Sequence, residues 1–209
     1  MTITQALIWI ALGYTCGSVP WSVLVSKLFR SEDARSVGDG NPGATNAWIA
    51  AGWKVGLIVL LLDVSKGIIP VVAGLLFIGP AQVNLDYVLL ALVWVAPVVG
   101  HAWSPFLRFG GGKALASSWG VWIALTFGAA FPVGLALLGL VHLLQTNHAI
   151  TVTLCLVGFT LVFVTIFGGK DLFIFSILNL GLVLFKHRRE YRNGIVFRGW
   201  IRKLTGKLV

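Results

Sequence analysis

The sequence predicts an all-α fold: a polytopic integral membrane bundle of about seven transmembrane helices, formed by a single domain over residues 1–209. Of its residues, 57% are hydrophobic and 11% are charged, whereas about a quarter are charged in a typical soluble domain. Long apolar stretches with few charges are typical of membrane spans. The nine tryptophans agree with this class, because tryptophan concentrates at the headgroup level of a bilayer.

The expected spans follow from the apolar runs, which cover residues 4–28, 55–78, 87–103, 114–144, 150–167 and 172–185. The run at 114–144 contains no charged residue. As one helix it would be about 46 Å long, against a hydrocarbon core of about 30 Å. We therefore expect it to turn near Gly128 to Pro132 and to cross the bilayer twice.

The basic residues predict the orientation, because lysine and arginine concentrate in cytoplasmic loops. If residues 114–144 cross twice, the polar loops at 29–46 and 104–113 and the tail at 186–209 share one side. Lys170 then lies on the other side. We therefore predict an outside N-terminus, a cytoplasmic C-terminus and a multi-pass protein of the bacterial cytoplasmic (inner) membrane.

The net charge of +9 points to an anionic partner. Because the cations are spread over short loops and one tail, we expect anionic membrane lipid or a phosphorylated substrate, and no nucleic acid. The tail at 186–209 is expected to form a basic, amphipathic helix on anionic lipid. Alternatively, its charge only fixes the topology. The oligomeric state is left open.

The segment at residues 17–20 and the two cysteines have structural interpretations. The segment Gly17-Ser18-Val19-Pro20 predicts a kink, with Ser18 capping the freed backbone groups. Cys16 and Cys155 lie in apolar runs without CxxC spacing, so we expect two small buried residues. We expect neither a metal nor a cofactor, and no cleaved signal peptide.

The first polar motif is the loop of residues 38–46, which reads GDGNPGATN. Its glycines permit positive φ and close backbone approach, and successive N–H groups in such a turn can hold an anion. Thr45 or Asn46 is expected to cap a helix that begins near Ala47, and helix N-termini favour phosphate. The alternative is an ordinary linker with Asx turns.

The second motif is the segment of residues 100–113, in which a glycine run ends in Lys113 and opens an apolar helix. This pattern suggests a phosphate cradle with a cation, although it lacks the spacing of a P-loop. His101 ends a span, where a polar side chain must find a partner or face a site. Alternatively, His101 is interfacial and Lys113 is a topology anchor.

The third motif is Asp63 with Lys66, three residues apart within the second apolar run. They can pair on one helix face, and ionisable residues at membrane depth are usually paired or functional. A structural lock and a substrate contact both stay open. A small transporter or a scaffold is the alternative class, but a transporter should show a polar path across the bilayer, and this pair is the only charged pair expected at mid-depth.

Together these segments resemble the PlsY family of bacterial acyl-phosphate-dependent glycerol-3-phosphate acyltransferases. The resemblance runs in order through residues 17–20, 38–46, 62–67, 100–101, 111–113 and 186–188. It implies a seven-span enzyme of phospholipid biosynthesis. Such an enzyme moves a fatty acyl group from acyl phosphate to the 1-position of glycerol 3-phosphate, giving lysophosphatidic acid without coenzyme A or acyl carrier protein.

The resemblance and the motifs together assign the candidate site. The candidate proton acceptors are Asp39, His101 and His187. The candidate substrate- and phosphate-binding residues are Gly38, Gly40, Asn41, Gly43, Thr45, Asn46, Lys66, Arg108, Gly111, Gly112, Lys113 and Arg188. Lys113 is expected to neutralise phosphate charge, and the backbone N–H groups of residues 38–43 and 110–113 to stabilise the negative charge that develops in acyl transfer.

Four positions depart from the family pattern. The chain has Asp39 for a serine, Ile49 or a neighbour for an arginine, Gly110 for a lysine, and Glu190 for an asparagine. Two cations are thereby missing and an Asp is added, although like charge near a phosphate is unfavourable. Candidate replacements are Arg108, Arg188, Arg189 and Lys54. The departures predict a changed acceptor, such as an uncharged alcohol or an amine, or a loss of activity.

Overall fold

The computed structural model describes residues 2–29, 32–78 and 87–204, without the side chains of 202–204. All regular elements of these residues are helices, and the β-type pairing among them is an isolated bridge between Gln145 and Phe197. The elements are α1 (Ile3–Ser18), α2 (Trp21–Leu28), α3 (Ala44–Ala51), α4 (Trp53–Ile78), α5 (Tyr87–Ala102), η2 (Pro105–Leu107), α6 (Leu115–Leu125), α7 (Ala130–Leu144), α8 (His148–Phe167), α9 (Lys170–His187), η3 (Glu190–Asn193) and α10 (Gly199–Leu204). The all-α prediction is confirmed for the described residues.

Four helical segments are long and apolar enough to cross a membrane, namely Ile3–Leu28, Trp53–Phe77, Tyr87–Leu107 and His148–Phe167. The predicted turn in the run at 114–144 is confirmed, because α6 ends at Leu125 and α7 begins at Ala130. With 11 and 15 residues, these helices are about 16 and 22 Å long, shorter than a hydrocarbon core. The count of seven spans and the orientation stay predictions.

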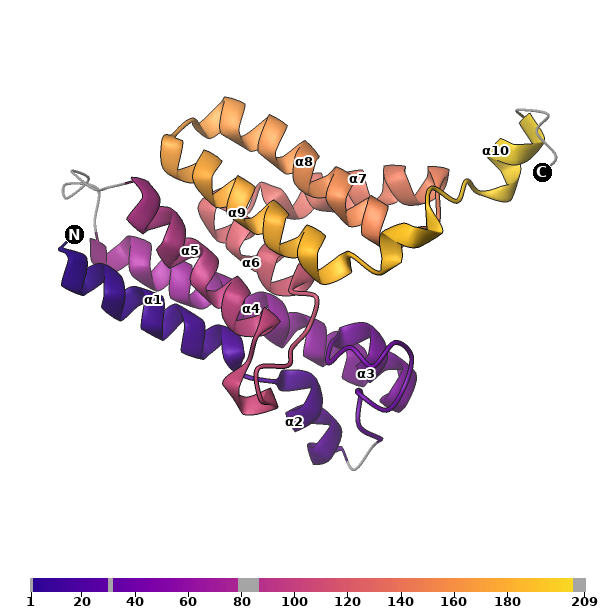
Figure 1. The fold of residues 1–209 in the computed structure, drawn as a ribbon, viewed down its shortest axis with the longest axis horizontal. Coiled ribbons are helices and arrows are strands. Elements are labelled where there is room, and N and C mark those ends of the chain that lie inside the picture. The colour runs from indigo at the N-terminus through magenta and orange to yellow at the C-terminus, as the bar shows by residue number, and fades with distance from the viewer. Residues whose placement is uncertain (1, 30–31, 79–86, 205–209) are drawn as a thin grey trace.

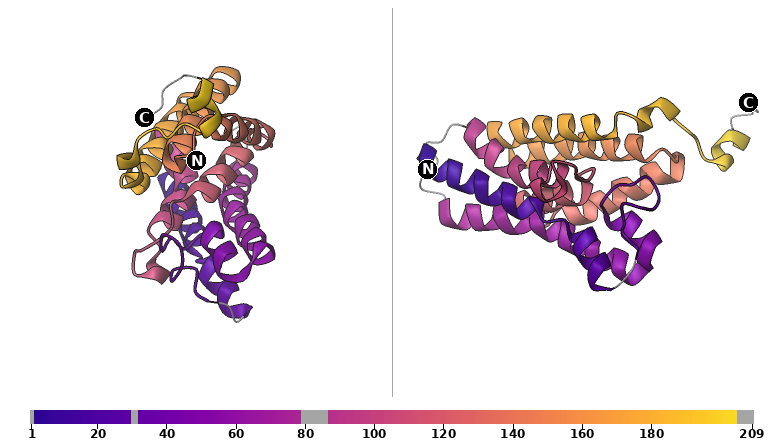
Figure 2. Two further views of the ribbon diagram at one scale, coloured as in Figure 1. Left: turned by 90° about the vertical axis from the view of Figure 1, so that its right-hand side faces the viewer. Right: turned by 60° about the horizontal axis from the view of Figure 1, so that its bottom comes forward.

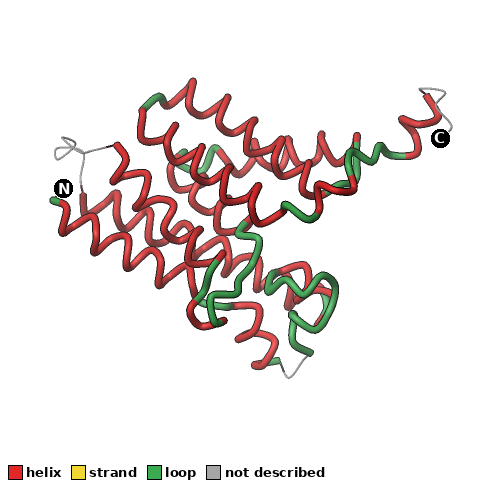
Figure 3. Tube along the Cα trace, viewed as in Figure 1, coloured by secondary structure: helices red, strands yellow, loops and turns green. Residues whose placement is uncertain are grey.

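The helices form a bundle in which α1 packs on α5, α4 on α6, and α8 between α7 and α9. Two further views show the same arrangement, with α2 and α3 projecting from the end of the bundle that also carries α10 (Figure 2). The connections that precede α3 and α6, and the chain after α9, gather toward this end (Figures 1 and 3). Polar segments far apart in the sequence are thereby brought together.

Glycines let α4 and α6 approach closely. A Cβ at Gly67 would lie 2.2 Å from the carbonyl oxygen of Ser117, and one at Gly120 would lie 2.1 Å from that of Val64. Both distances are shorter than any van der Waals contact, so only glycine fits. This packing fixes the start of α6 relative to the middle of α4, and both segments line the site described below.

The segment at residues 17–20 is a break and not only a kink, because α1 ends at Ser18 and α2 begins at Trp21. The expected cap was wrong: the Ser18 hydroxyl donates to the carbonyl of Tyr14, 2.7 Å away. The carbonyls at the break are satisfied from α4 and from the loop after α5. The Ser104 hydroxyl donates to Ser18 O at 2.6 Å, and the Lys66 ammonium donates to Val19 O at 2.9 Å.

The tail is also less helical than expected. After α9 the chain forms the short helices η3 and α10, and residues 205–209 lie outside the described part. The tail docks on the end of α7, where Arg198 Nε donates to His142 O at 2.6 Å and Trp200 Nε1 donates to Leu143 O at 3.0 Å.

Of the two cysteines, Cys155 is buried and Cys16 is half-buried.

Replacing Gly120 by alanine should destabilise the protein by about 1–3 kcal/mol, because the new methyl group overpacks the crossing of α4 and α6. Thermal unfolding of purified protein in detergent measures the effect. Gly181→Ala on α9 is the matched control, because a Cβ there meets no heavy atom within 4 Å. Equal unfolding temperatures for the two variants would contradict this packing.

Candidate active site

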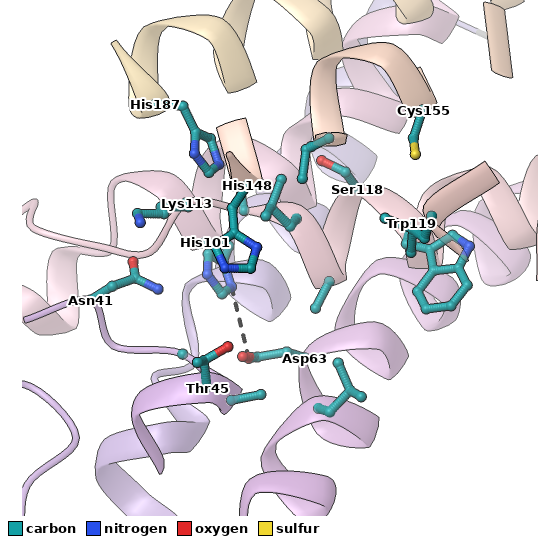
Figure 4. A pocket seen from close by; sticks show the side chains of 18 of the residues that line it. Asn41, Thr45, Asp63, His101, Lys113, Ser118, Trp119, His148, Cys155 and His187 are labelled. Atoms are coloured by element: carbon teal, nitrogen blue, oxygen red, sulfur yellow. Dashed lines mark ion pairs between the residues drawn. The ribbon is translucent and has the colours of Figure 1, made fainter. Parts of the chain in front are cut away.

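A cavity of about 510 Å³ opens among the loop before α3, the helices α3, α4, α6, α7 and α8, and the chain after α9. Its polar end is lined by Asp39, Asn41, Thr45, Lys113, His187 and Glu190. Its apolar end is lined by Trp119, Gly134, Leu138, Val152, Leu156 and Phe159. Figure 4 shows Asn41 and Lys113 on one side of this pocket, and Trp119 and Cys155 on the other.

Lys113 is the centre of the polar end. Its ammonium lies 2.5 Å from Asp39 Oδ2 and 2.5 Å from Glu190 Oε1. The other oxygen of each carboxylate is also bonded: Asp39 Oδ1 accepts from the buried Asn46 amide at 2.9 Å, and Glu190 Oε2 lies 3.0 Å from His187 Nδ1. These bonds join the loop before α3, the start of α6 and the tail.

The ion pairs keep all three groups charged near neutral pH. Partial burial raises the pKa of the Asp39 and Glu190 carboxyls, but hydrogen bonds led by that from Lys113 outweigh it, so both pKa values lie below their ordinary range. Burial lowers the pKa of Lys113, but its bonds to Asp39 and Glu190 raise it above its ordinary value. The triad therefore carries two negative charges and one positive charge.

Two helices begin at this pocket. α3 begins at Ala44 and α6 at Leu115, and no side chain among the described residues caps either start. The first N–H groups of a helix have no partner within it and favour an anion. The expected cap by Thr45 or Asn46 was wrong, because the helix begins three residues earlier than Ala47 and Asn46 instead donates to Val37 O and Asp39 Oδ1.

The expected cradle of loop N–H groups is partly occupied. The N–H of Gly40 donates to Val37 O, that of Asn41 to Asp39 Oδ1, and that of Gly43 to Asn41 O. In the second loop, the N–H groups of Gly110 and Gly112 donate to the carbonyls of Leu107 and His101. These bonds fold the loops, and the uncapped starts of α3 and α6 remain as anion donors.

The second loop instead packs on His101. A Cβ at Gly112 would lie 2.0 Å from His101 Nε2, and one at Gly111 would lie 2.4 Å from His101 O. Their lack of a side chain lets the loop cover the histidine. His101 lines the pocket, and its Nδ1 lies 3.7 Å from Asp63 Oδ1. The dashed line in Figure 4 marks this contact, which is longer than a hydrogen bond.

Asp63 and Lys66 form the buried pair that the sequence predicts, with Oδ1 and Nζ 2.8 Å apart and side chains 3% and 4% exposed. Lys66 also holds Val19 O and does not line the pocket, whereas Asp63 does. The lysine therefore serves as a structural lock at the break between α1 and α2.

Several of the proposed binding residues lie outside the pocket, namely Gly40, Lys66, Arg108, Gly111, Gly112 and Arg188. Arg108 follows η2 in a left-handed conformation, with φ of 55°. Arg188 donates to Phe185 O and lies over the Phe185 ring at 4.3 Å. Arg189 and Lys54 also lie outside it, so Lys113 is the only lysine or arginine among the described residues that line the pocket.

Sequence reasoning missed the features that shape the pocket. Glu190 was noted only as a departure, and its contact with Lys113 depends on the turn before α8, where the Asn147 amide donates to Glu190 O at 3.2 Å and Gly194 O at 2.8 Å. The signal in the sequence that could have indicated this contact was the polar turn at residues 145–148, between two apolar runs. The apolar lining, including Trp119 and Gly134, lies in uniformly apolar helices and left no signal.

Comparisons with known proteins identify the family. The family model for glycerol-3-phosphate acyltransferase matches residues 7–195. A relative of that name from Rubrobacter xylanophilus is 36% identical over 203 residues, which cover 95% of this chain and 94% of the relative. The chain belongs to the glycerol-3-phosphate acyltransferase family.

Other matches are more local or more distant. Glycerol-3-phosphate acyltransferase 1 of Thermotoga maritima is 38% identical over 117 residues, so the match spans about half of each protein, 56% in both cases. A crystal structure of PlsY, an integral membrane glycerol 3-phosphate acyltransferase, in its glycerol 3-phosphate form superposes with a TM-score of 0.77. That structure is 28% identical to this chain, and the superposition covers 96% of this chain and 92% of the other. With its apolar helices, this likeness shows an integral membrane protein of the predicted family.

Replacing Lys66 by methionine should destabilise the protein by about 3–5 kcal/mol, because it leaves the Asp63 carboxylate buried without its partner. The free energy of unfolding in detergent measures the effect. In Asp63→Leu/Lys66→Met, much of the loss should be recovered, because neither charge stays buried. Lys54→Met, at an exposed site on the same helix, is the control, and an equal effect there would contradict the lock.

Proposed function

We propose that the protein is a membrane acyltransferase that moves a fatty acyl group from acyl phosphate to the 1-hydroxyl of glycerol 3-phosphate, giving lysophosphatidic acid for phospholipid synthesis. The observation that carries this proposal is the pocket, which joins a polar end holding two helix starts and Lys113 to an apolar end between α6, α7 and α8. An acyl phosphate has the same two parts, an anionic head and a hydrocarbon chain.

The family supports the proposed acceptor and product. The matching relatives are named for glycerol 3-phosphate, and PlsY is known in a glycerol 3-phosphate form and a lysophosphatidic acid form. The acyl phosphate head would lie at the starts of α3 and α6, beside Lys113, because N–H groups and an ammonium stabilise phosphate oxygens. The site would face the cytoplasm of a bacterial inner membrane, on the side of the basic tail and anionic lipid.

The reaction requires the acceptor oxygen to attack the acyl carbonyl. The new ester C–O bond forms, the bond between the carbonyl carbon and the phosphate oxygen breaks, and phosphate leaves with the electron pair. Because acyl phosphate is already activated, holding the two substrates together supplies much of the rate. The helix starts and Lys113 would stabilise the charge that develops on the phosphate.

A histidine is well placed to receive the hydroxyl proton. His187 is buried, lines the pocket, and is held through Nδ1 by Glu190. Its Nε2 is buried without a hydrogen-bond partner among the described residues, as a base that awaits a substrate proton would be. Asp39 is the second candidate because it is half exposed beside Lys113, and His101, which is buried and also lines the pocket, is the third.

The central test combines purified protein with palmitoyl phosphate and glycerol 3-phosphate. Release of phosphate with formation of lysophosphatidic acid, followed by mass spectrometry, is expected. Lys113→Met should lower kcat/KM by about a hundredfold, because two carboxylates would then face the substrate phosphate without a cation. Lys54→Met, which lies outside the pocket, should keep the activity of the unaltered protein. Near-normal turnover by Lys113→Met would exclude the phosphate role.

The apolar end predicts the preference for acyl chains. A Cβ at Gly134 would lie 2.7 Å from Trp119 Nε1 and 3.0 Å from Phe159 Cζ, and Trp119 is fixed because its Nε1 donates to Ala130 O at 2.9 Å. Gly134→Ala should therefore lower kcat/KM for palmitoyl phosphate about tenfold relative to octanoyl phosphate.

Gly139→Ala on the same helix is the matched control for this change, because a Cβ there meets no heavy atom within 4 Å. Its ratio of activities on the two acyl phosphates should equal that of the unaltered protein. If Gly134→Ala leaves the same ratio, the acyl chain lies elsewhere.

A further inference from the structure

The charge balance of the pocket differs from what two phosphorylated substrates require. Among the described residues that line it, Asp39, Asp63 and Glu190 are carboxylates, and Lys113 is the only lysine or arginine. Asp63 is offset by its buried partner Lys66. The remaining two carboxylates and one ammonium leave the polar end with a net charge of −1. Acyl phosphate and glycerol 3-phosphate both add negative charge.

Lys113 has little capacity left for two anions. An ammonium has three donor hydrogens, and two of the ammonium's contacts are already to Asp39 Oδ2 and Glu190 Oε1. One donor and the helix starts remain for a phosphate, which the donor substrate needs for its leaving group. A second phosphate beside the same carboxylates is repelled, because like charges within a few ångströms are unfavourable in a partly buried site.

The same groups suit the hydroxyls of an uncharged acceptor. Carboxylate oxygens accept hydrogen bonds and do not donate them, so they bind hydroxyls well and phosphate oxygens poorly. The side chains of Asp39 and Glu190 are 50% and 29% exposed, which leaves lone pairs open to the pocket. Ile49, 60% exposed, adds apolar surface to the lining.

We infer that the protein acylates a second class of acceptor, neutral polyols with adjacent hydroxyl groups, and that Asp39 and Glu190 select for them. The inference rests on the proposed acyl transfer from acyl phosphate. A polyol hydroxyl attacks the acyl carbonyl, the ester C–O bond forms, and the bond to phosphate breaks. The hydroxyl proton passes to His187 or to the released phosphate, so the products are a monoacyl polyol and inorganic phosphate.

The test offers glycerol and glycerol 3-phosphate separately to the full-length protein with palmitoyl phosphate. Phosphate release is measured, and the products are separated by mass spectrometry as monoacylglycerol or lysophosphatidic acid. Monoacylglycerol is expected above the rate without protein. The ratio of kcat/KM for glycerol to that for glycerol 3-phosphate should fall about tenfold in Asp39→Ser and in Glu190→Gln, because each change removes one negative charge.

The ratio separates charge selection from a general loss of activity. If Glu190 only orients His187, Glu190→Gln would lower turnover of both acceptors equally, and this would contradict the inference. Asp33→Ser is the matched control: Asp33 lies in the same segment, pairs with Arg35 at 2.6 Å and lies outside the pocket. The ratio for this control should equal that of the unaltered protein.

The outcomes distinguish this inference from the proposed function. Lysophosphatidic acid as the sole product, with no monoacylglycerol, overturns the inference and leaves the proposed function intact. Monoacylglycerol as the sole product supports the inference and overturns glycerol 3-phosphate as the acceptor. If phosphate is released with neither glycerol nor glycerol 3-phosphate, the protein does not carry out the proposed acyl transfer, and the inference is overturned with it.

Discussion

The ion-pair triad of Asp39, Lys113 and Glu190 is the interaction on which the site depends. Its members come from the loop before α3, the loop before α6 and the chain after α9, and each distance to Lys113 is 2.5 Å. It joins three segments that lie far apart in the sequence. Because the triad is partly exposed, its net contribution to stability is modest. Its importance is that it sets the charge which a substrate meets.

The polar groups behind the triad hold the scaffold in place. The break at Pro20 frees carbonyl groups inside the bundle, where an unbonded polar group is costly. Ser104 and Lys66 satisfy them, and Lys66 is in turn held by Asp63. One set of bonds therefore fixes α1, α4 and the loop after α5 together. The close glycine crossing of α4 with α6 carries this rigidity to the start of α6, beside Lys113.

The two ends of the pocket differ in their chemistry. Helix starts and Lys113 form an end suited to the leaving phosphate, and the apolar helices α6, α7 and α8 form an end suited to the acyl chain. The two carboxylates line the polar end on either side of Lys113. The family membership and the local charge therefore favour different acceptors, and glycerol 3-phosphate and neutral polyols become distinguishable by experiment.

The sequence by itself determined the helical membrane class and predicted where a site would form. Apolar runs force helices in a membrane, because backbone groups must bond internally, and the polar loops with Asp39, His101 and Lys113 predict a site at one end of the bundle. Only the tertiary structure decided which groups stay available. Several loop N–H groups are used in folding the loops, and Gly112 packs on His101. Arg108 and Arg188 lie outside the pocket, and Glu190 reaches Lys113 across 77 positions of sequence. Such pairings depend on how helices pack, and one-dimensional patterns of hydrophobicity and charge do not encode them.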